Sequence, residues 1–151
     1  MRTQIGVISD THGLLRPEAI AALGKSDLIF HAGDIGKPEI LEALSQIAPV
    51  IAVRGNHDTD DWAAAIAERE TVVIGSVSIH LIHIVQAFDR LANPVQIVIS
   101  GHSHKPSIEH RDGILFLNPG SAGRRRFKLP VSIAQLEIHD SVAEAKIIQL
   151  M

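Results

Sequence analysis

The chain contains no cysteine, which excludes disulfide bonds and thiolate ligands for a metal. This absence suits a reducing compartment, so we expect a cytoplasmic protein. No apolar run approaches the roughly 20 residues that a membrane-spanning helix requires. The apolar run near the N-terminus, residues 5–8, is also too short for a signal peptide. We therefore expect no membrane insertion and no membrane partner.

Long runs of like charge are absent too. The net charge is −3 with His neutral, and the basic residues gather only in the segment 123–128. A nucleic-acid partner is not favoured, because non-specific binding depends on Lys and Arg side chains that neutralise phosphates. The 151 residues, of which 46% are apolar and 21% charged, fit a single soluble domain over residues 1–151. The oligomeric state stays open at this level, and a homo-oligomer is compatible with the composition.

The first half of the chain alternates β-type runs with helical patterns, and this alternation indicates parallel βαβ units. Pro17 and Pro38 fit the first position of a helix, and Gly24 closes the first of the two. The expected elements of this half are, in order, Ile5–Ser9, Pro17–Leu23, Asp27–His31, Pro38–Ile47, Pro49–Val53 and Asp60–Glu68.

The second half carries β-type runs separated by turn signals, which predicts a mostly antiparallel arrangement. Asp112-Gly113 is the strongest short hairpin signal, and Gly75-Ser76 and Asp140-Ser141 separate two further pairs of runs. An α/β fold with two sheets packed face to face and helices outside accommodates both halves. The expected strands of this half are Glu70–Ile74, Val77–His83, Val95–Ser100, Ser107–Arg111, Ile114–Asn118, Val131–His139 and Ala143–Gln149.

Five polar clusters share one position, because each lies at the C-terminal end of an expected strand. In open α/β sheets ligands bind at this edge, so the fold would bring the clusters onto one rim. Glycine at positions 33, 55 and 101 would let the backbone turn sharply and approach an ion. The clusters are Asp10-Thr11-His12, Gly33-Asp34, Gly55-Asn56-His57-Asp58, His83 and Gly101-His102-Ser103-His104.

The side chains of these clusters are typical of a metal site. Imidazole nitrogen and carboxylate oxygen suit Mn, Fe, Zn or Ni. The clusters offer more ligands than the three or four of a single zinc site. A shared carboxylate can hold two metals about 3.5–4 Å apart, the arrangement that cleaves phosphate esters. Taken singly, Asp10-Thr11-His12 and Gly33-Asp34 are more typical of turns and His83 of a strand end, and only Gly101-His102-Ser103-His104 is moderately suggestive of ligands. All five in this order favour the metal site.

In this order the motifs resemble those of the calcineurin-like metallophosphoesterases. Asn118-Pro119-Gly120-Ser121 also resembles a tetrapeptide of the small bacterial and archaeal phosphodiesterase branch. The resemblance implies a four-layer αββα sandwich and two divalent metal ions, with Mn expected first and Ni, Zn or Fe as alternatives. The ligands that it implies are Asp10, His12, Asp34 and His104 for the first metal, and Asp34, Asn56, His83 and His102 for the second.

By the same resemblance, His57 contacts the phosphate and acts as a general acid, and Asp58 orients His57. The implied reaction is hydrolysis of a small phosphodiester by a hydroxide that bridges the two metals. A phosphomonoesterase with the same site is one alternative. Another is a metal-binding scaffold, because the scaffold subunit of the retromer complex resembles these enzymes and acts mainly by binding proteins.

Two positions stay open at this level. The family usually has Gly beside the histidine at position 83, whereas Ile82 and Ile84 flank it here. A β-branched neighbour stiffens the backbone, and His80 is a competitor that shares no strand face with His83. The basic segment Arg124–Arg126 is either a solvated loop or a clamp for substrate phosphate. The other histidines are expected to be structural, namely His31, His80, His110 and His139.

Overall fold

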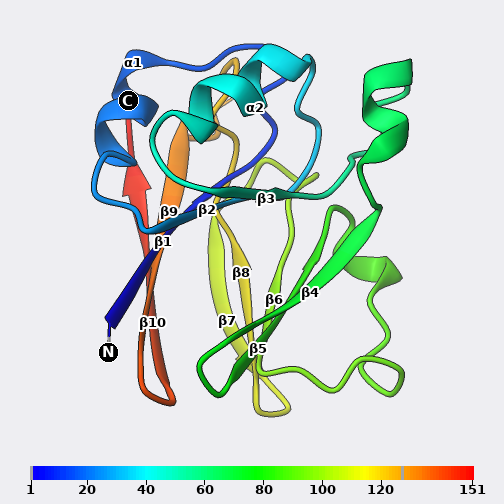
Figure 1. Cartoon of the computed structure of the whole chain (residues 1–151), viewed down its shortest axis with the longest axis vertical. Coiled ribbons are helices and arrows are strands. Elements are labelled where there is room, and N and C mark those ends of the chain that lie inside the picture. The colour runs from blue at the N-terminus through cyan, green and yellow to red at the C-terminus, as the bar shows by residue number, and fades with distance from the viewer. Residues whose placement is uncertain (1, 127) are drawn as a thin grey trace.

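The computed structural model describes residues 2–126 and 128–151. These residues form two five-stranded sheets that pack face to face (Figure 1). The first sheet contains, in spatial order, β10 (Val142–Gln149), β9 (Ser132–His139), β1 (Arg2–Ile8), β2 (Leu28–His31) and β3 (Val50–Ala52). The second contains β4 (Arg69–Ile74), β5 (Val77–Ile82), β6 (Ile97–Ile99), β8 (Ile114–Asn118) and β7 (Ser107–Arg111).

Each sheet combines parallel and antiparallel pairs. In the first sheet β1, β2 and β3 are parallel, as the alternation of strands and helices predicts, and β9 and β10 join them antiparallel. In the second sheet β5, β6 and β8 are parallel, although hairpin signals alone predict an antiparallel order. The crossovers 83–96 and 100–113 make this possible, because parallel neighbours need connections of about a dozen residues.

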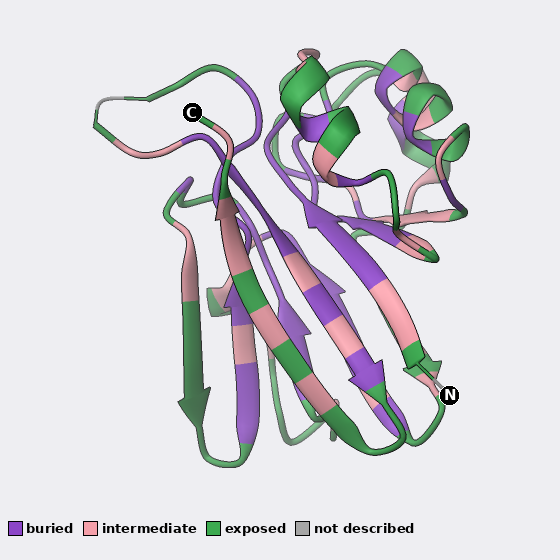
Figure 2. Ribbon diagram, turned by 90° about the vertical axis from the view of Figure 1, so that its left-hand side faces the viewer, coloured by how far each residue is buried: buried purple, intermediate pink, exposed green. Residues whose placement is uncertain are grey.

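The main core lies between the two sheets. In β1, Ile5 and Val7 face this core, whereas Ile8 faces the opposite side of the sheet. A slip of one residue in β1 would exchange these faces, so burial on both sides fixes the register and the place where β1 ends. β6 is buried along its whole length, and the edge strand β10 alternates half-buried and exposed residues (Figure 2).

Two short helices, α1 (Pro17–Ala22) and α2 (Pro38–Ser45), cover the outer face of the first sheet (Figure 1). Each has proline at its beginning and a glutamate in its first turn, where the helix dipole favours negative charge. Ile40 and Leu44, one turn apart, bury the apolar face of α2 against the sheet. No helix within the described part of the chain is long and apolar enough to cross a membrane.

The outer face of the second sheet carries a thinner layer. Val98 and Phe116 point outward from β6 and β8 and pack with Phe88. Phe88 belongs to the segment between β5 and β6, whose described residues include the short 3-10 helix η2 (Val85–Ala87). The expected αββα order is therefore confirmed, with its last layer reduced to this segment.

The helix predicted over Asp60–Glu68 is wrong in type and in length. The chain forms the 3-10 helix η1 (Asp61–Ala65) and then becomes extended at Ile66. The backbone N–H of Arg54 donates a hydrogen bond to the carbonyl of Ala67 at 2.8 Å, which draws the chain alongside the end of β3. A tertiary contact thus overrides the local helical pattern.

Candidate metal centre

The structure brings the predicted metal ligands together at one rim. Parallel strands present their C-terminal ends on the same edge, so β1, β2 and β3 contribute from the first sheet and β5 and β6 from the second. Each ligand follows one of these strands within a few residues, although the ligands span most of the sequence. They are Asp10 and His12 after β1, Asp34 after β2, Asn56 after β3, His83 after β5, and His102 and His104 after β6.

One group of ligands gathers around Asp10. The ligand atoms of Asp10, His12 and His104 all lie within 4.8 Å of one another. His104 Nε2 lies 3.4 Å from Asp10 Oδ1, and His12 Nε2 lies 3.8 Å from the same oxygen. His12 Nε2 is also 3.6 Å from Asp34 Oδ2, so this group reaches the next one.

A second group gathers around Asp34. Its ligand atoms, with those of His83 and His102, again lie within 4.8 Å of one another. His83 Nε2 is 3.2 Å from Asp34 Oδ2, and His102 Nδ1 is 3.2 Å from the Asn56 side-chain oxygen. Asp34 also belongs to a third group, with His12 and His57, whose ligand atoms lie within 4.8 Å of one another. The side chain of Asp34 therefore lies between the other two groups.

Unpaired buried atoms test whether this site suits cations. Within the described residues, four buried side-chain atoms have no hydrogen-bond partner, and three of them belong to candidate ligands: Asp10 Oδ1, His83 Nε2 and His104 Nδ1, beside His80 Nε2 away from the site. Such atoms are costly in a folded protein unless another partner reaches them. His83 Nδ1 donates to the carbonyl of Ala32 at 2.7 Å, which leaves the Nε2 lone pair facing the two carboxylates. The donor set thus fits divalent metal ions.

The histidine at position 83 reaches the site despite its isoleucine neighbours. Ile84 has ordinary extended dihedral angles of −107° and 109°, so the missing glycine imposes no strain there. His80 points away from the site, and its Nδ1 lies 2.9 Å from the Thr71 hydroxyl. His83, and not His80, is therefore the candidate ligand.

The backbone of the site is strained. Five candidate ligands have positive φ angles, a conformation that residues other than glycine rarely adopt. Hydrogen bonds between the ligand loops hold this geometry, since the N–H of Asp10 donates to Gly33 O and that of His12 to Asp34 O, both at 3.0 Å. A Cβ atom at Gly55 would collide with the Asp34 carboxylate. The five angles are 55° at Asp10, 46° at His12, 57° at Asp34, 73° at His102 and 63° at His104.

The electrostatics keep the carboxylates ionised. Burial raises the pKa of Asp34, but the contact with His83 and the backbone N–H of His57 outweigh it and hold the pKa well below its usual range. Burial also raises the pKa of Asp10, and the His104 contact and the His83 charge lower it further than burial raises it. Burial lowers the pKa of His12, which favours the neutral imidazole that binds metals. For His83, burial lowers the pKa but the contact with Asp34 raises it more.

His57 lies at the mouth of the site. Its side chain is 62% exposed, and its Nδ1 lies 3.0 Å from Asp34 Oδ2. Its backbone N–H donates to Asp34 Oδ1 at 2.9 Å. Asp34 thus holds both the ring and the backbone of His57 at the mouth of the site.

The buried carboxylate of Asp58 accepts hydrogen bonds from backbone N–H groups. The resemblance implies that Asp58 orients His57, which stays a prediction. The N–H groups of Ile35 and Gly36 donate at 3.0 Å, and that of Gly55 at 2.9 Å. Asp58 therefore joins the loop that follows Asp34 to the loop that carries Asn56 and His57.

A buried histidine that the sequence marked only as structural supports the same loops. The N–H of Gly33 donates to His31 Nδ1 at 3.1 Å, so the proton of the neutral ring lies on Nε2. That nitrogen donates to the Thr11 hydroxyl at 3.0 Å, which donates to the carbonyl of Ile35 at 2.8 Å. Burial is the main cause that lowers the pKa of His31 to about 4. In the sequence, only the position of His31, two residues before Gly33-Asp34, indicates that it supports the ligand loops.

The Asn-Pro-Gly-Ser motif also supports the ligand loops. Asn118 Nδ2 donates to the carbonyl of Gly101 at 3.0 Å, directly before His102. The Ser121 hydroxyl donates to the carbonyl of Asp10 at 3.1 Å. Both side chains therefore position backbone that carries ligands.

The basic segment begins beside the same backbone. A Cβ atom at Gly123 would collide with the carbonyl oxygens of Asp10 and Thr11, so the segment leaves the rim in close contact with it. Arg124, Arg125 and Arg126 are exposed, and Phe127 lies outside the described residues. A phosphate clamp in this segment stays a prediction.

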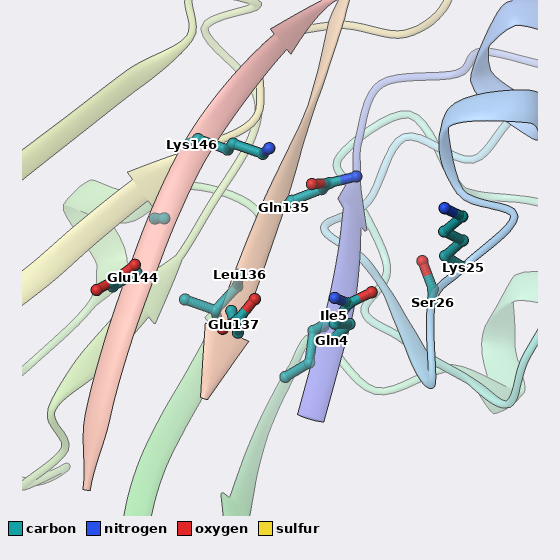
Figure 3. Close-up of a pocket in the computed structure, with 10 residues that line it drawn as sticks. Gln4, Ile5, Lys25, Ser26, Gln135, Leu136, Glu137, Glu144 and Lys146 are labelled. Carbon is teal, nitrogen blue, oxygen red and sulfur yellow. The ribbon is translucent and has the colours of Figure 1, made fainter. Parts of the chain in front are cut away.

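A separate cavity lies away from the rim. It holds about 240 Å³ on the outer face of β1, β9 and β10, beside the end of α1 (Figure 3). Its lining contains Lys25, Glu137, Glu144 and Lys146 but none of the predicted metal ligands. This cavity therefore adds no side chain to the candidate metal site.

The two-sheet fold and a rim of histidine and carboxylate ligands define a metal-dependent phosphoesterase class. The family model described as the calcineurin-like phosphoesterase superfamily domain matches residues 3–141. A "probable metallophosphoesterase" of Methanocaldococcus jannaschii is 38% identical over 97% of this chain and 81% of its own length. The chain therefore belongs to the calcineurin-like phosphoesterase superfamily.

Solved structures agree with this assignment. A predicted phosphoesterase of Streptococcus pneumoniae TIGR4 has a TM-score of 0.72 and 29% identity, over 99% of this chain and 90% of that one. Two less identical structures share the fold. Vps29 of Chaetomium thermophilum has a TM-score of 0.85 at 20% identity, over 99% and 86% of the two chains. An archaeal phosphodiesterase has a TM-score of 0.78 at 22% identity, over 96% and 99%.

Proposed function

We propose that this chain is a phosphodiesterase that uses two divalent metal ions, and the position of Asp34 carries the proposal. Asp34 Oδ2 lies 3.2 Å from His83 Nε2 and 3.6 Å from His12 Nε2, so one carboxylate faces both ligand groups. When bound, two such ions would supply positive charge at the phosphate and would lower the pKa of a nearby water. The chain contributes ligands that are held in place before substrate arrives.

The ligand groups divide between two metal positions. Nitrogen and oxygen donors accept Mn, Ni, Zn or Fe, and we propose Mn as the native metal. The strained loops and the loop-to-loop hydrogen bonds of Asp58 would hold the donors in place for both ions. The first position comprises Asp10, His12, Asp34 and His104, and the second comprises Asp34, Asn56, His83 and His102.

His57 fits the role of general acid. Asp34 engages its Nδ1, which leaves Nε2 directed toward substrate at the exposed mouth of the site. A proton donated from Nε2 to the leaving oxygen would remove the negative charge that develops there, an effect of about 10²–10⁴-fold on rate.

A diester suits the shape of the rim. Asn56, His57 and His102 are all exposed, so these side chains leave room for an ester group on either side of phosphorus. The archaeal phosphodiesterase of the same fold supports this choice. A phosphomonoesterase would use the same residues. The Vps29 fold supports a protein-binding scaffold, which the complete ligand set and His57 disfavour.

The test is hydrolysis of bis-p-nitrophenyl phosphate and of p-nitrophenyl phosphate by metal-stripped protein, with and without Mn²⁺, Ni²⁺ or Zn²⁺. We expect turnover that depends on metal and favours the diester. Preference for the monoester would assign a phosphatase with the same site. No turnover with any of the three metals would overturn catalysis and support the scaffold.

A further inference from the structure

A groove begins at one of the proposed ligands and runs along the outer face of β8 and β7. It holds about 230 Å³, and His102, Ser103 and Asn118 lie at its metal end. Arg111 and Phe116 lie along its other part, and η2 contributes Val85 and Gln86. A group esterified to a phosphate at the second metal position therefore has a surface beside it on which to lie.

One wall of this groove carries a cation–π pair. The guanidinium carbon of Arg111 lies 4.3 Å from the ring centroid of Phe116. Phe88 meets Phe116 edge-on at a centroid distance of 6.2 Å, and Arg111 Nε lies 3.4 Å from a Glu109 oxygen. The Arg111 side chain is 57% exposed, so the face of its guanidinium that turns away from Phe116 is open to another planar group.

The charge of the groove disfavours a second phosphate. Arg111 is the cationic residue of the lining, and Glu109, which also lines the groove, pairs with it. Gln86, Ser103 and Asn118 add uncharged donors and acceptors. Flat stacking surface, neutral hydrogen-bonding groups and low net charge together suit a heterocyclic base.

We propose that this groove binds the nucleoside of a nucleotidyl phosphodiester whose phosphate lies at the metal position of His102. The proposal rests on the proposed function and adds the substrate class to it. The groove holds about 230 Å³. This volume is below the roughly 300–1,000 Å³ of typical ligand pockets, so we assign one nucleoside and not a longer strand.

The test compares two diesters with the same leaving group, thymidine 5′-(p-nitrophenyl phosphate) and methyl p-nitrophenyl phosphate, on metal-loaded protein. We expect kcat/KM to be about tenfold or more higher for the thymidine ester, as base stacking on a side chain predicts. Arg111→Gln should bring the ratio of the two kcat/KM values down to about one. Phe116→Leu is a second variant, read by the same ratio and checked for folding by circular dichroism.

Arg90→Gln is the matched control. Arg90 is 53% exposed and pairs with Asp112 at 2.9 Å, close in sequence to the groove segments but outside its lining. This variant should keep both kcat/KM values and their ratio. If Arg90→Gln lowers the ratio of the two kcat/KM values as much as Arg111→Gln does, the groove is not the cause of the preference for the thymidine ester.

The result separates this proposal from the proposed function. Equal kcat/KM for the two esters overturns the nucleoside groove and leaves a phosphodiesterase. If neither ester turns over, binding of thymidine 5′-monophosphate and of methyl phosphate is compared by amide chemical shifts in metal-loaded protein. Tighter binding of the nucleotide, lost in Arg111→Gln, supports the groove even then, and equal binding overturns it.

Discussion

The two ends of the sandwich use the same rare backbone conformation in different ways. At the rim, the candidate ligands with positive φ include Asp10 and Asp34. At the opposite end, Asp112 and Asp140 have φ angles of 53° and 58° at the tips of the hairpins β7–β8 and β9–β10 (Figure 1). Aspartate tolerates this conformation better than most residues do, which explains why it stands at both ends.

What holds the conformation differs between the two ends. The Asp112 and Asp140 side chains are 72% and 78% exposed, and each hairpin closes through residues adjacent in sequence. Asp10 and Asp34 are buried, and their backbone is held by hydrogen bonds between loops distant in sequence. Tertiary contacts maintain the strain at the end that carries the candidate ligands, whereas strain at the hairpins is a local solution to a tight turn.

The sharpest test of this comparison replaces an aspartate by asparagine at each end, Asp34 at the rim and Asp112 at a hairpin. Asp34→Asn removes the charge shared by the two ligand groups, so we expect loss of both metals and a fall in kcat of at least about 10⁴-fold. Metal content by mass spectrometry of the native protein and kcat for bis-p-nitrophenyl phosphate provide the measurement. Retention of two bound metals in Asp34→Asn would contradict the bridging role.

His57→Ala separates metal binding from proton donation at the rim. We expect full metal content and a loss of about 10²–10⁴-fold in kcat for a diester with an alkoxide leaving group. The loss should be much smaller with p-nitrophenolate, because that leaving group needs little protonation. Equal losses with both leaving groups would remove His57 as the general acid.

Asp58→Asn tests whether the rim depends on contacts between loops. An amide leaves one acceptor oxygen for three backbone N–H groups, so we expect a loss of about 3 kcal/mol or more in the free energy of unfolding. Metal affinity should fall by about 10–100-fold. Urea unfolding and metal titration measure the two effects. Asp60→Asn, at an exposed position nearby, is the control and should change neither.

Burial of His31 should make the free energy of unfolding of the metal-free protein depend on pH. Its folded pKa of about 4 lies below its ordinary value of 6.5, so the unfolded chain binds the proton more readily. The contribution of neutral His31 to the free energy of unfolding is complete above pH 6.5. It is lost as pH falls from 6.5 through 4, and the loss amounts to up to about 3 kcal/mol. We measure the free energy of unfolding by urea, with a chelator present to remove metal, for the wild type and for His31→Gln. It should depend less steeply on pH in the variant. Identical slopes would remove His31 as the cause.

The smallest effect is expected at the hairpin end. Asp112→Asn keeps a residue that tolerates positive φ and removes only an exposed ion pair with Arg90, at 2.9 Å. We expect a change of less than about 0.5 kcal/mol in the free energy of unfolding and no change in kcat. A large loss of stability would show that the two ends do not differ as proposed.

The sequence predicted most of the strands because burial and turn signals are local. Val77–His83 and Asp112-Gly113 are recognisable without any knowledge of the partners of the strands. The helix predicted over Asp60–Glu68 failed because the hydrogen bond from Arg54 to Ala67 lies outside any local window. The parallel order of β5, β6 and β8 escaped prediction for the same reason, since strand order depends on pairing across the fold.

The sequence by itself determined which candidate ligands this protein offers and that they follow strand ends, because side-chain chemistry and strand periodicity depend on each residue in turn. Only the tertiary structure decided that Asp34 lies between both ligand groups, that Asp58 joins two loops, and that a groove begins at His102. These features arise from distances between segments far apart in the chain. Such distances are set by how the two sheets pack and in which direction their strands run.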